Sequence, residues 1–197
     1  ALIAEPTIGI ITNVGTSHIE LLGSQEAIAE AKGELIRCLG PDSVAILNED
    51  DHFVKAMSSI AKGKTVTYGI HSNATVIGSH LRYKKDGIKF TCKCYDEVFD
   101  VFLPMIGEHN VYDALAAIVA GRVLGIKSNT IRKGLSEFTG TPMRQEIVPF
   151  EDIVILNDAY NANPSSMAEA IKALGQLEGK RKIAMLGDML ELGDFSE

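Results

Sequence analysis

Residues 8–47 read IGIITNVGTSHIELLGSQEAIAEAKGELIRCLGPDSVAIL. The stretch opens with an apolar run at residues 8–14, which is typical of a buried strand. Ser24 then precedes a helical pattern that extends to about Leu39. Residues 43–47 form a second short apolar run. Because the order is strand, helix, strand, the stretch predicts an α/β fold built on a mostly parallel sheet flanked by helices.

The pattern continues beyond this unit. Residues 50–61 read as a short helix and residues 65–68 as a third strand. Residues 73–103 contain β-rich runs separated by turn residues, which predicts an antiparallel β flap that decorates the parallel sheet. A strong helix is expected from Glu108 to Leu124. Its predicted apolar face comprises Val111, Leu115, Ala116, Ile118 and Val119.

We expect Ser128 to cap a further helix that ends near Phe138. The Gly-Thr-Pro sequence at residues 140–142 breaks the pattern, and a strand, helix, strand series restarts from Gln145. This predicts two domains, at residues 1–140 and 141–197. The second is expected to be a truncated Rossmann-like domain, because one strand–helix–strand unit is too small to complete such a fold.

In that second series, residues 153–156 and 182–186 are the expected strands, and residues 164–177 form the expected helix. Asn163 is suited to the helix cap and Pro164 to the first helical turn. The hydrophobic face expected for the earlier helix at residues 24–39 consists of Ile28, Ala31, Leu35 and Leu39.

Composition excludes some classes of protein. The net charge of −7 and the lack of a basic cluster argue against a nucleic-acid partner. The apolar runs are far shorter than the ~20 residues that a membrane-spanning helix needs. Cys92 and Cys94 have no second ligand pair at zinc spacing, so they read as two same-face strand positions. The cysteine pattern favours a reducing, cytoplasmic setting.

Two side chains in the first part stand out. His18 ends a glycine-containing polar turn that follows the first strand, where ligands bind in parallel sheets. It either faces a ligand or lies in a solvated loop. Lys32 lies beside the apolar face of its helix, so it must reach solvent, pair with an acceptor or be chemically altered. A carbamylated lysine would supply an anionic oxygen ligand for magnesium.

Three further segments carry polar groups. Asn110 lies in a first helical turn, where it either serves as a cap or presents its amide to an adenine edge. Arg144 follows the expected domain break and could reach phosphates held by the neighbouring domain. Residues 157–164 contain more asparagine and aspartate than a helix cap requires, although turns also favour these residues. Residues 63–65 resemble the end of a P-loop, but they lack its first glycine and precede a strand, so we interpret them as a turn.

Taken together, these segments resemble the Mur ligase family over essentially the whole chain. The matching runs are ITNVGTSHIELLGS (11–24), EAKGE (30–34), GEHNV (107–111), RQE (144–146), NDAYNANPSSM (157–167) and LGDMLELG (186–193). The last two runs point to the members that join D-alanyl-D-alanine to a UDP-N-acetylmuramoyl-tripeptide. The resemblance therefore implies an ATP-dependent peptide ligase of peptidoglycan biosynthesis.

The resemblance also implies roles for individual residues. His18 and a carbamylated Lys32 would lie at a Mg²⁺ site. The remaining roles concern the nucleotide: His109 and Asn110 would contact the adenine of ATP, Arg144 and Asp158 would reach phosphate and ribose, and Tyr160 and Asn161 would line the same cleft. His18, Lys32 and Arg144 are the residues that we expect to serve catalysis.

In this family ATP phosphorylates the tripeptide carboxylate, and the dipeptide amine then attacks the acyl phosphate. The family's P-loop would precede Ala1 and most of the last domain would follow Glu197, so we expect the isolated chain to be inactive and the complete protein to be monomeric. Two other interpretations stay open. One is a folylpolyglutamate synthase-like ligase, and the other is a catalytically silent nucleotide-binding or assembly module.

Overall fold

The computed structural model describes residues 3–16, 19–84 and 86–190. A six-stranded sheet with strand order β1-β2-β3-β4-β5-β6 forms its main body. The strands are β1 (Ile8–Ile11), β2 (Val44–Asn48), β3 (Lys64–Gly69), β4 (Val76–Lys84), β5 (Gly87–Cys94) and β6 (Glu97–Leu103). Neighbours from β1 to β4 pair in parallel, whereas β4, β5 and β6 pair antiparallel. The expected α/β class is confirmed, and the antiparallel strands extend the parallel sheet rather than forming a separate flap.

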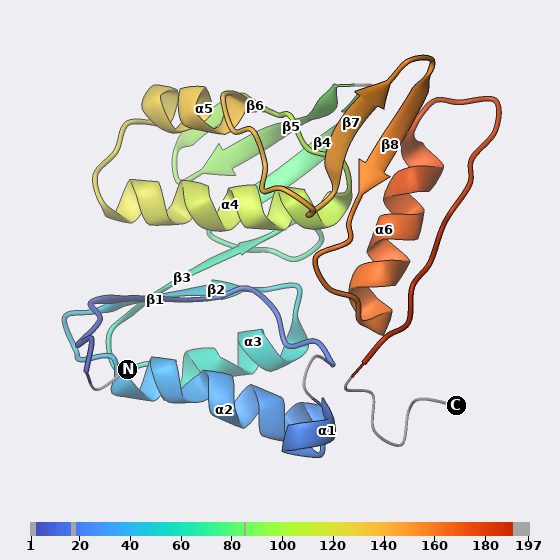
Figure 1. Cartoon of the computed structure of the whole chain (residues 1–197). Coiled ribbons are helices and arrows are strands. Elements are labelled where there is room, and N and C mark those ends of the chain that lie inside the picture. Colours follow the sequence, from blue (N-terminus) through green and yellow to red (C-terminus); the bar gives the residue numbers. More distant parts are fainter. Residues whose placement is uncertain (1–2, 17–18, 85, 191–197) are drawn as a thin grey trace.

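Helices cover both faces of this sheet (Figure 1). On the side of β1 and β2 lie α1 (Ile19–Leu22), α2 (Gln25–Cys38), α3 (His52–Ala56) and a 3₁₀ turn (Met57–Ile60). On the other side, α4 (Glu108–Val123) packs across β2, β3, β4 and β5, and α5 (Ser128–Ser136) packs against β6 and α4. Within the described ranges, no helix is long and apolar enough to cross a membrane.

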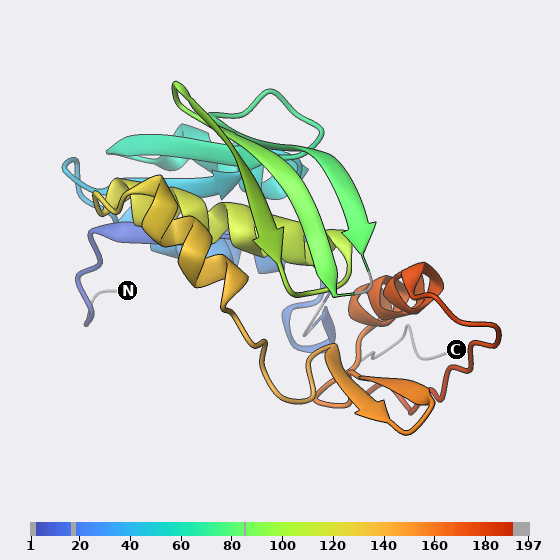
Figure 2. The same ribbon diagram turned by 90° about the horizontal axis from the view of Figure 1, so that it is seen from above.

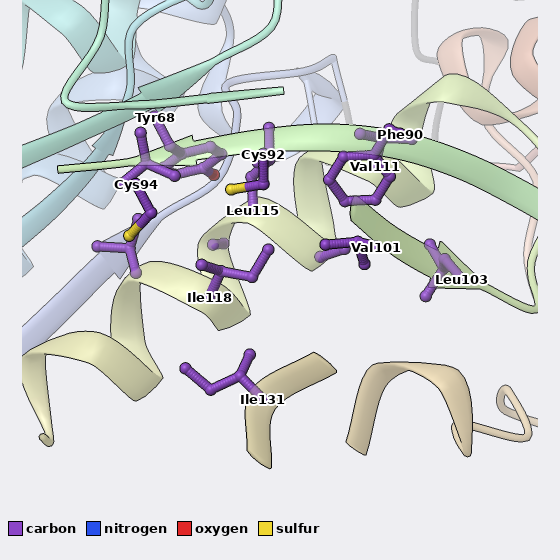
Figure 3. Close-up of a cluster of buried hydrophobic side chains, with 14 of the residues drawn as sticks. Tyr68, Phe90, Cys92, Cys94, Val101, Leu103, Val111, Leu115, Ile118 and Ile131 are labelled. Atoms are coloured by element: carbon purple, nitrogen blue, oxygen red, sulfur yellow. The ribbon is translucent and has the colours of Figure 1, made fainter. Parts of the chain in front are cut away.

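The core between the sheet and α4 follows the predicted periodicity (Figure 3). Every residue of the expected apolar face of α4 is buried, including Val111, Leu115 and Ile118 at 0% exposure. Cys92 and Cys94 both point into this core from β5, which confirms the same-face interpretation. Burial raises the pKa of the Cys92 thiol to about 12, so this thiol stays protonated and unreactive at neutral pH.

The predicted apolar face of α2 is confirmed at Ile28 and Leu39, which are buried, and Leu35 packs against the same core, but Ala31 differs. Ser24 caps the helix as expected, because its hydroxyl accepts a hydrogen bond from the backbone N–H of Ala27. The buried helical residues are Ile28, Gly33 and Ile36. Ala31, which was expected on this face, is exposed. The helix is therefore rotated slightly about its axis from the predicted orientation, and this rotation places the neighbouring Lys32 in solvent.

Strand β1 ends at Ile11, earlier than the predicted residue 14, because side chains take over the next hydrogen bonds. The Asn48 amide donates to the Thr12 carbonyl over 2.9 Å. The Val14 N–H donates to the Asp51 carboxylate over 2.8 Å. These bonds take the place of the backbone hydrogen bonds that a longer β1 would form with a neighbouring strand. They hold residues 12–14 as a defined loop at the carboxyl end of the sheet.

Other local expectations can also be checked. The turn interpretation of residues 63–65 is wrong for two of the three residues, because Lys64 and Thr65 already belong to β3 and only Gly63 precedes the strand. The backbone passes close to Gly63, where an added Cβ would lie 2.2 Å from the Ser43 carbonyl oxygen. Ser128 is not the cap of α5; Lys127 occupies that position, and the Ser128 hydroxyl donates instead to the carboxylate of Glu97.

A two-stranded antiparallel sheet follows, made of β7 (Glu146–Phe150) and β8 (Ile153–Asn157), and α6 (Pro164–Gln176) comes next. Asn163 caps α6 with Pro164 in its first turn, as predicted. Residues 182–186 are not a strand, contrary to the prediction. Their apolar side chains, such as Met185, stay exposed, so neither a strand ladder nor a buried face holds them as β structure among the described residues.

Candidate functional site

A cleft of about 750 Å³ lies where the carboxyl ends of β1 and β2 meet the beginning of α4 and the segment that leads into α6. Both views of the chain show α6 beside that end of α4 (Figures 1 and 2). Polar residues that line it include Thr12, Asn13, Asn48, His109, Asn110, Asp113, Arg144, Gln145, Asp158 and Glu169. The cleft therefore gathers polar groups that are more than one hundred residues apart in sequence.

The strand-end loop contributes Thr12, Asn13 and Gly15 to the lining. His18, which the sequence places at the end of this loop, lies outside the described residues. The loop therefore reaches the cleft as expected, and the role of His18 stays a prediction.

Lys32 does not line the cleft, and it does not face the core. Its ammonium group donates to the backbone carbonyl of Asn13 over 2.7 Å. This contact fits the interpretation that the lysine reaches solvent and pairs with an acceptor. An unmodified lysine amine is not a magnesium ligand, so Lys32 would hold Mg²⁺ only in its carbamylated form. Among the described residues no cluster of three His, Cys, Asp or Glu side chains exists, and carbamylation stays a prediction.

At the beginning of α4, Gly107 rather than Asn110 is the N-cap. The Asn110 side-chain nitrogen donates to the Ile106 carbonyl over 2.6 Å and lies 3.4 Å from the side-chain oxygen of Gln145. No described residue donates to the Asn110 side-chain oxygen. Because the nitrogen already has protein acceptors, the oxygen is the part of this amide that can accept a hydrogen bond from a ligand amine.

Gly107 is required by the position of His109. The glycine has a φ of 95°, and an added Cβ would lie 2.4 Å from the His109 ring. We expect Gly107→Ala to lower the free energy of unfolding by about 2 kcal/mol and to displace the ring from the cleft. Gly125→Ala is the matched control, because Gly125 also has a positive φ, of 77°, but open space around it. Equal losses for the two variants in urea unfolding would show that the ring contact is unimportant.

His109 also connects α4 to α6. Its Nδ1 atom lies 3.8 Å from the carboxylate of Glu169, and both side chains line the cleft. Nδ1 is buried without a hydrogen-bond partner among the described residues. The imidazole ring and the carboxylate therefore bring α4 and α6 together at the wall of the cleft.

Arg144 and Asp158 both line the cleft, and their contacts with phosphate and ribose stay predictions. The Asp158 carboxylate accepts a hydrogen bond of 3.1 Å from the Gln145 N–H. Tyr160 and Asn161 do not line it. The Tyr160 ring lies against the Arg144 guanidinium, with 4.0 Å between the guanidinium carbon and the ring centroid. The Asn161 side chain accepts from the N–H of Ala162 over 2.9 Å, which is turn chemistry.

Sequence reasoning missed Gln145 as a site residue. Its side chain is only 8% exposed and lines the cleft, where it lies between Asn110 and Asp158. Its φ of 50° is rare for a residue with a side chain. A glutamine carries no sequence signal for this backbone conformation, so only the structure could identify it.

Asp113 was missed as well. It lies one helical turn after Asn110 and lines the cleft. Burial raises the pKa of its carboxyl group, and the nearby His109 opposes this effect. An aspartate spaced three residues from a cleft residue on a helix faces the same side, so helical spacing could have pointed to it.

Comparison with known protein families matches two consecutive models. The Mur ligase middle domain matches residues 1–121, and the Mur ligase glutamate ligase domain matches residues 143–197. The first of these covers more than half of the chain. The residues between the two matches are 122–142, so the second match begins one residue before Arg144.

Curated relatives agree with these models. The chain is 42% identical to the UDP-N-acetylmuramoyl-tripeptide–D-alanyl-D-alanine ligase of Bacillus subtilis, over 99% of this chain and 42% of the relative. It is 31% identical to the Escherichia coli ligase of the same name, over 99% of this chain and 44% of the relative. The chain thus spans less than half the length of these relatives.

Solved structures give the same result. MurF from Acinetobacter baumannii superposes with a TM-score of 0.92 and 32% identity, over 98% of this chain and 42% of that protein. MurF ligase from Thermotoga maritima, solved in complex with ADP, superposes with a TM-score of 0.89 and 25% identity, over 99% of this chain and 45% of that protein. With the two family models, these similarities show that the chain belongs to the Mur ligase family.

Proposed function

We propose that this chain forms one wall of the nucleotide cleft of an ATP-dependent ligase that joins D-alanyl-D-alanine to a UDP-N-acetylmuramoyl-tripeptide. The observation that carries the proposal is the position of Arg144 and Asp158 in one cleft with His109 and Asn110. The relatives that carry this activity in their names and the relative solved with ADP support it. The chain would contribute the later part of a central domain, residues 1–140, and the start of a last domain, residues 141–197.

The polar groups of the cleft suit the nucleotide chemistry. The Asn110 amide oxygen can accept a hydrogen bond from an exocyclic amine such as that of adenine. The Asp158 carboxylate can accept hydrogen bonds from ribose hydroxyls. Arg144 supplies a permanent positive charge for phosphate oxygens, because its guanidinium cannot be deprotonated at physiological pH.

The proposed reaction has two steps. The tripeptide carboxylate attacks the γ-phosphorus of ATP, and ADP leaves. The D-alanyl-D-alanine amine then attacks the carbonyl carbon of the acyl phosphate, and inorganic phosphate leaves as the amide forms. In both steps the protein's main tasks are to position the reactants and to stabilise the charge on the transferring phosphoryl oxygens. Arg144 performs the second task from the described part of the chain.

The proposal includes Mg²⁺ because the sequence resemblance implies a magnesium site at His18 and a carbamylated Lys32. A cytoplasmic setting is proposed from the cysteine pattern, and the complete protein is proposed to be monomeric. A folylpolyglutamate synthase-like activity is the second candidate. Lactobacillus casei FPGS superposes with a TM-score of 0.74 at 21% identity, which is a likeness of fold alone.

Calorimetric titration with a non-hydrolysable ATP analogue and Mg²⁺ tests the nucleotide site. We expect a protein extended upstream through a P-loop to bind, and the 197-residue chain to bind at least about tenfold more weakly, because backbone amides of a P-loop provide the main phosphate contacts. Asn110→Ala in the extended protein should weaken binding further. Absence of binding by both proteins would refute the nucleotide site.

Activity of the complete protein separates the two candidate ligases. The expected result is phosphate release that requires both UDP-N-acetylmuramoyl-tripeptide and D-alanyl-D-alanine. Release driven by a folate and glutamate, with no response to the dipeptide, would favour the second candidate. Ligation by the isolated chain would contradict our expectation that it is inactive.

A further inference from the structure

Arg144 has no carboxylate partner among the described residues, although it lines a cleft that also contains Asp158 and Glu169. Its guanidinium lies over an aromatic ring, that of Tyr160, with 4.0 Å between the guanidinium carbon and the ring centroid. We propose that Tyr160 is a positioning residue, which acts on the reaction by holding the Arg144 guanidinium toward the cleft. This inference rests on the proposed ligase function.

An aromatic face is suited to this task because it attracts a cation without neutralising it. A carboxylate at the same place would form a charge-assisted ion pair with the guanidinium and would compete with phosphate for the same N–H donors. The planar guanidinium lies against the ring face and keeps its N–H edge for another partner. Stacking therefore reduces the freedom of a long side chain and leaves its charge for the ligand.

The backbone fixes the ring and the guanidinium relative to each other. The Tyr160 N–H donates to the Met143 carbonyl over 3.1 Å, which joins the two segments one residue before Arg144. One residue after Arg144, the Gln145 N–H donates to Asp158 over 3.1 Å. Hydrogen bonds on both sides of Arg144 therefore hold its Cα opposite Tyr160.

The two residues that flank Arg144 have left-handed backbone conformations, with φ of 61° at Met143 and 50° at Gln145. Neither residue is a glycine, so each conformation costs energy and persists only because the surroundings enforce it. Strained backbone on both sides of one side chain is a sign that the direction of that side chain matters.

The exposure of Tyr160 distinguishes a positioning role from a structural one. The side chain is 62% exposed and does not line the cleft. Its loss should therefore leave the core intact, unlike the loss of the fully buried Tyr68. Because the ring contacts the cleft-lining Arg144 but does not line the cleft itself, we expect its effect on the reaction to pass through Arg144.

The test is steady-state kinetics of the complete ligase with Tyr160→Leu and Tyr160→Phe. We expect Tyr160→Leu to lower kcat by about two- to fivefold, the range that an exposed cation–π contact supports, with the KM for D-alanyl-D-alanine and the melting temperature unchanged. Tyr160→Phe keeps the ring face and should retain wild-type kcat. A Phe variant as slow as the Leu variant would overturn the proposal.

A double-mutant cycle with Arg144→Ala identifies the route of the effect. If Tyr160 acts through Arg144, then Tyr160→Leu will cause no further loss in an Arg144→Ala background. Equal losses in both backgrounds would overturn the inference. A wild-type complete protein without ligase activity would instead refute the proposed function, so the two failures are distinguishable.

Discussion

Replacing Arg144 by alanine is expected to lower kcat/KM for ATP in the complete ligase by about a thousandfold, because a fixed cationic donor at a transferring phosphoryl group has an effect of this size. The side chain lines the cleft and is exposed, and its charge is not neutralised by a described carboxylate. In the proposed reaction it would stabilise charge that develops on the phosphoryl oxygens. Protein stability should change little, because no core contact is lost.

Two further variants sharpen this measurement. Arg144→Lys keeps the charge but loses the planar donor edge and the stacking on Tyr160, so we expect intermediate activity. Arg82→Ala is the matched control, because Arg82 is an exposed arginine of β4 that does not line the cleft. A loss below about tenfold for Arg144→Ala would place the arginine outside the reaction.

Replacing Asp50 by alanine is expected to lower the free energy of unfolding of the chain by about 3 kcal/mol, because three donors lose their acceptor. The Asp50 carboxylate accepts from the Ile70 N–H at 2.6 Å and from the His71 N–H at 3.0 Å. It also accepts from the Tyr112 hydroxyl at 2.8 Å. The aspartate thus joins the end of β2, the β3–β4 connection and α4.

The same contacts give a pH dependence. Partial burial acts to raise the pKa of Asp50, but the hydrogen bonds that the carboxylate accepts outweigh it and lower the pKa from 3.8 to about 2. A lowered pKa means that the folded state favours the charged form. This contribution to stability is present above pH 3.8 and is lost as the pH falls toward 2.

Urea unfolding at several pH values measures both effects. Tyr112→Phe removes one donor and should cost about 1 kcal/mol. Asp42→Ala is the matched control, because Asp42 is exposed and forms no hydrogen bond or ion pair with the described residues. If Asp50→Ala unfolds at the same urea concentration as the control, the carboxylate does not support the fold.

Much of the fold could be predicted from the sequence. Helix α4, whose beginning lines the cleft, was predicted closely, because its apolar spacing is strong and all five expected core positions are buried. The cap at Ser24 and the Asn163-Pro164 start of α6 were predicted from capping chemistry alone. Such signals depend only on neighbouring residues, so these helix starts can be predicted without any knowledge of tertiary contacts.

The errors have tertiary causes. Strand β7 contains Pro149, and the hairpin turn that follows it, at Glu151 and Asp152, has no glycine or asparagine. The local sequence therefore does not predict the β7–β8 hairpin. Residues 182–186 have strand-like composition, but a strand also needs a neighbour to pair with. The direction of Lys32 depended on a small rotation of α2 that the sequence pattern could not resolve.

For the site, the sequence identified which segments meet, but not which of their side chains line the cleft and which contact other protein groups. Arg144, Asp158, His109 and Asn110 do line one cleft. Tyr160, however, contacts Arg144 rather than the cleft, and the Asn110 nitrogen binds the protein's own carbonyl groups. Both facts depend on rotamers and on backbone conformations at Met143 and Gln145, which residue type does not encode.

The narrow pairing of β3 with β4 has a consequence for folding kinetics. These two strands share only the pairs Tyr68–Val76 and Gly69–Ile77, whereas β4 and β5 pair along most of their length. The antiparallel strands close short loops and should form early, while the parallel strands must wait for their crossover helices. Helix α4, which packs on β2, β3, β4 and β5, spans this junction. Docking of α4 is therefore the event that we expect to make the two halves of the sheet unfold as one cooperative unit, and slowed amide exchange would appear on both sides of the junction together.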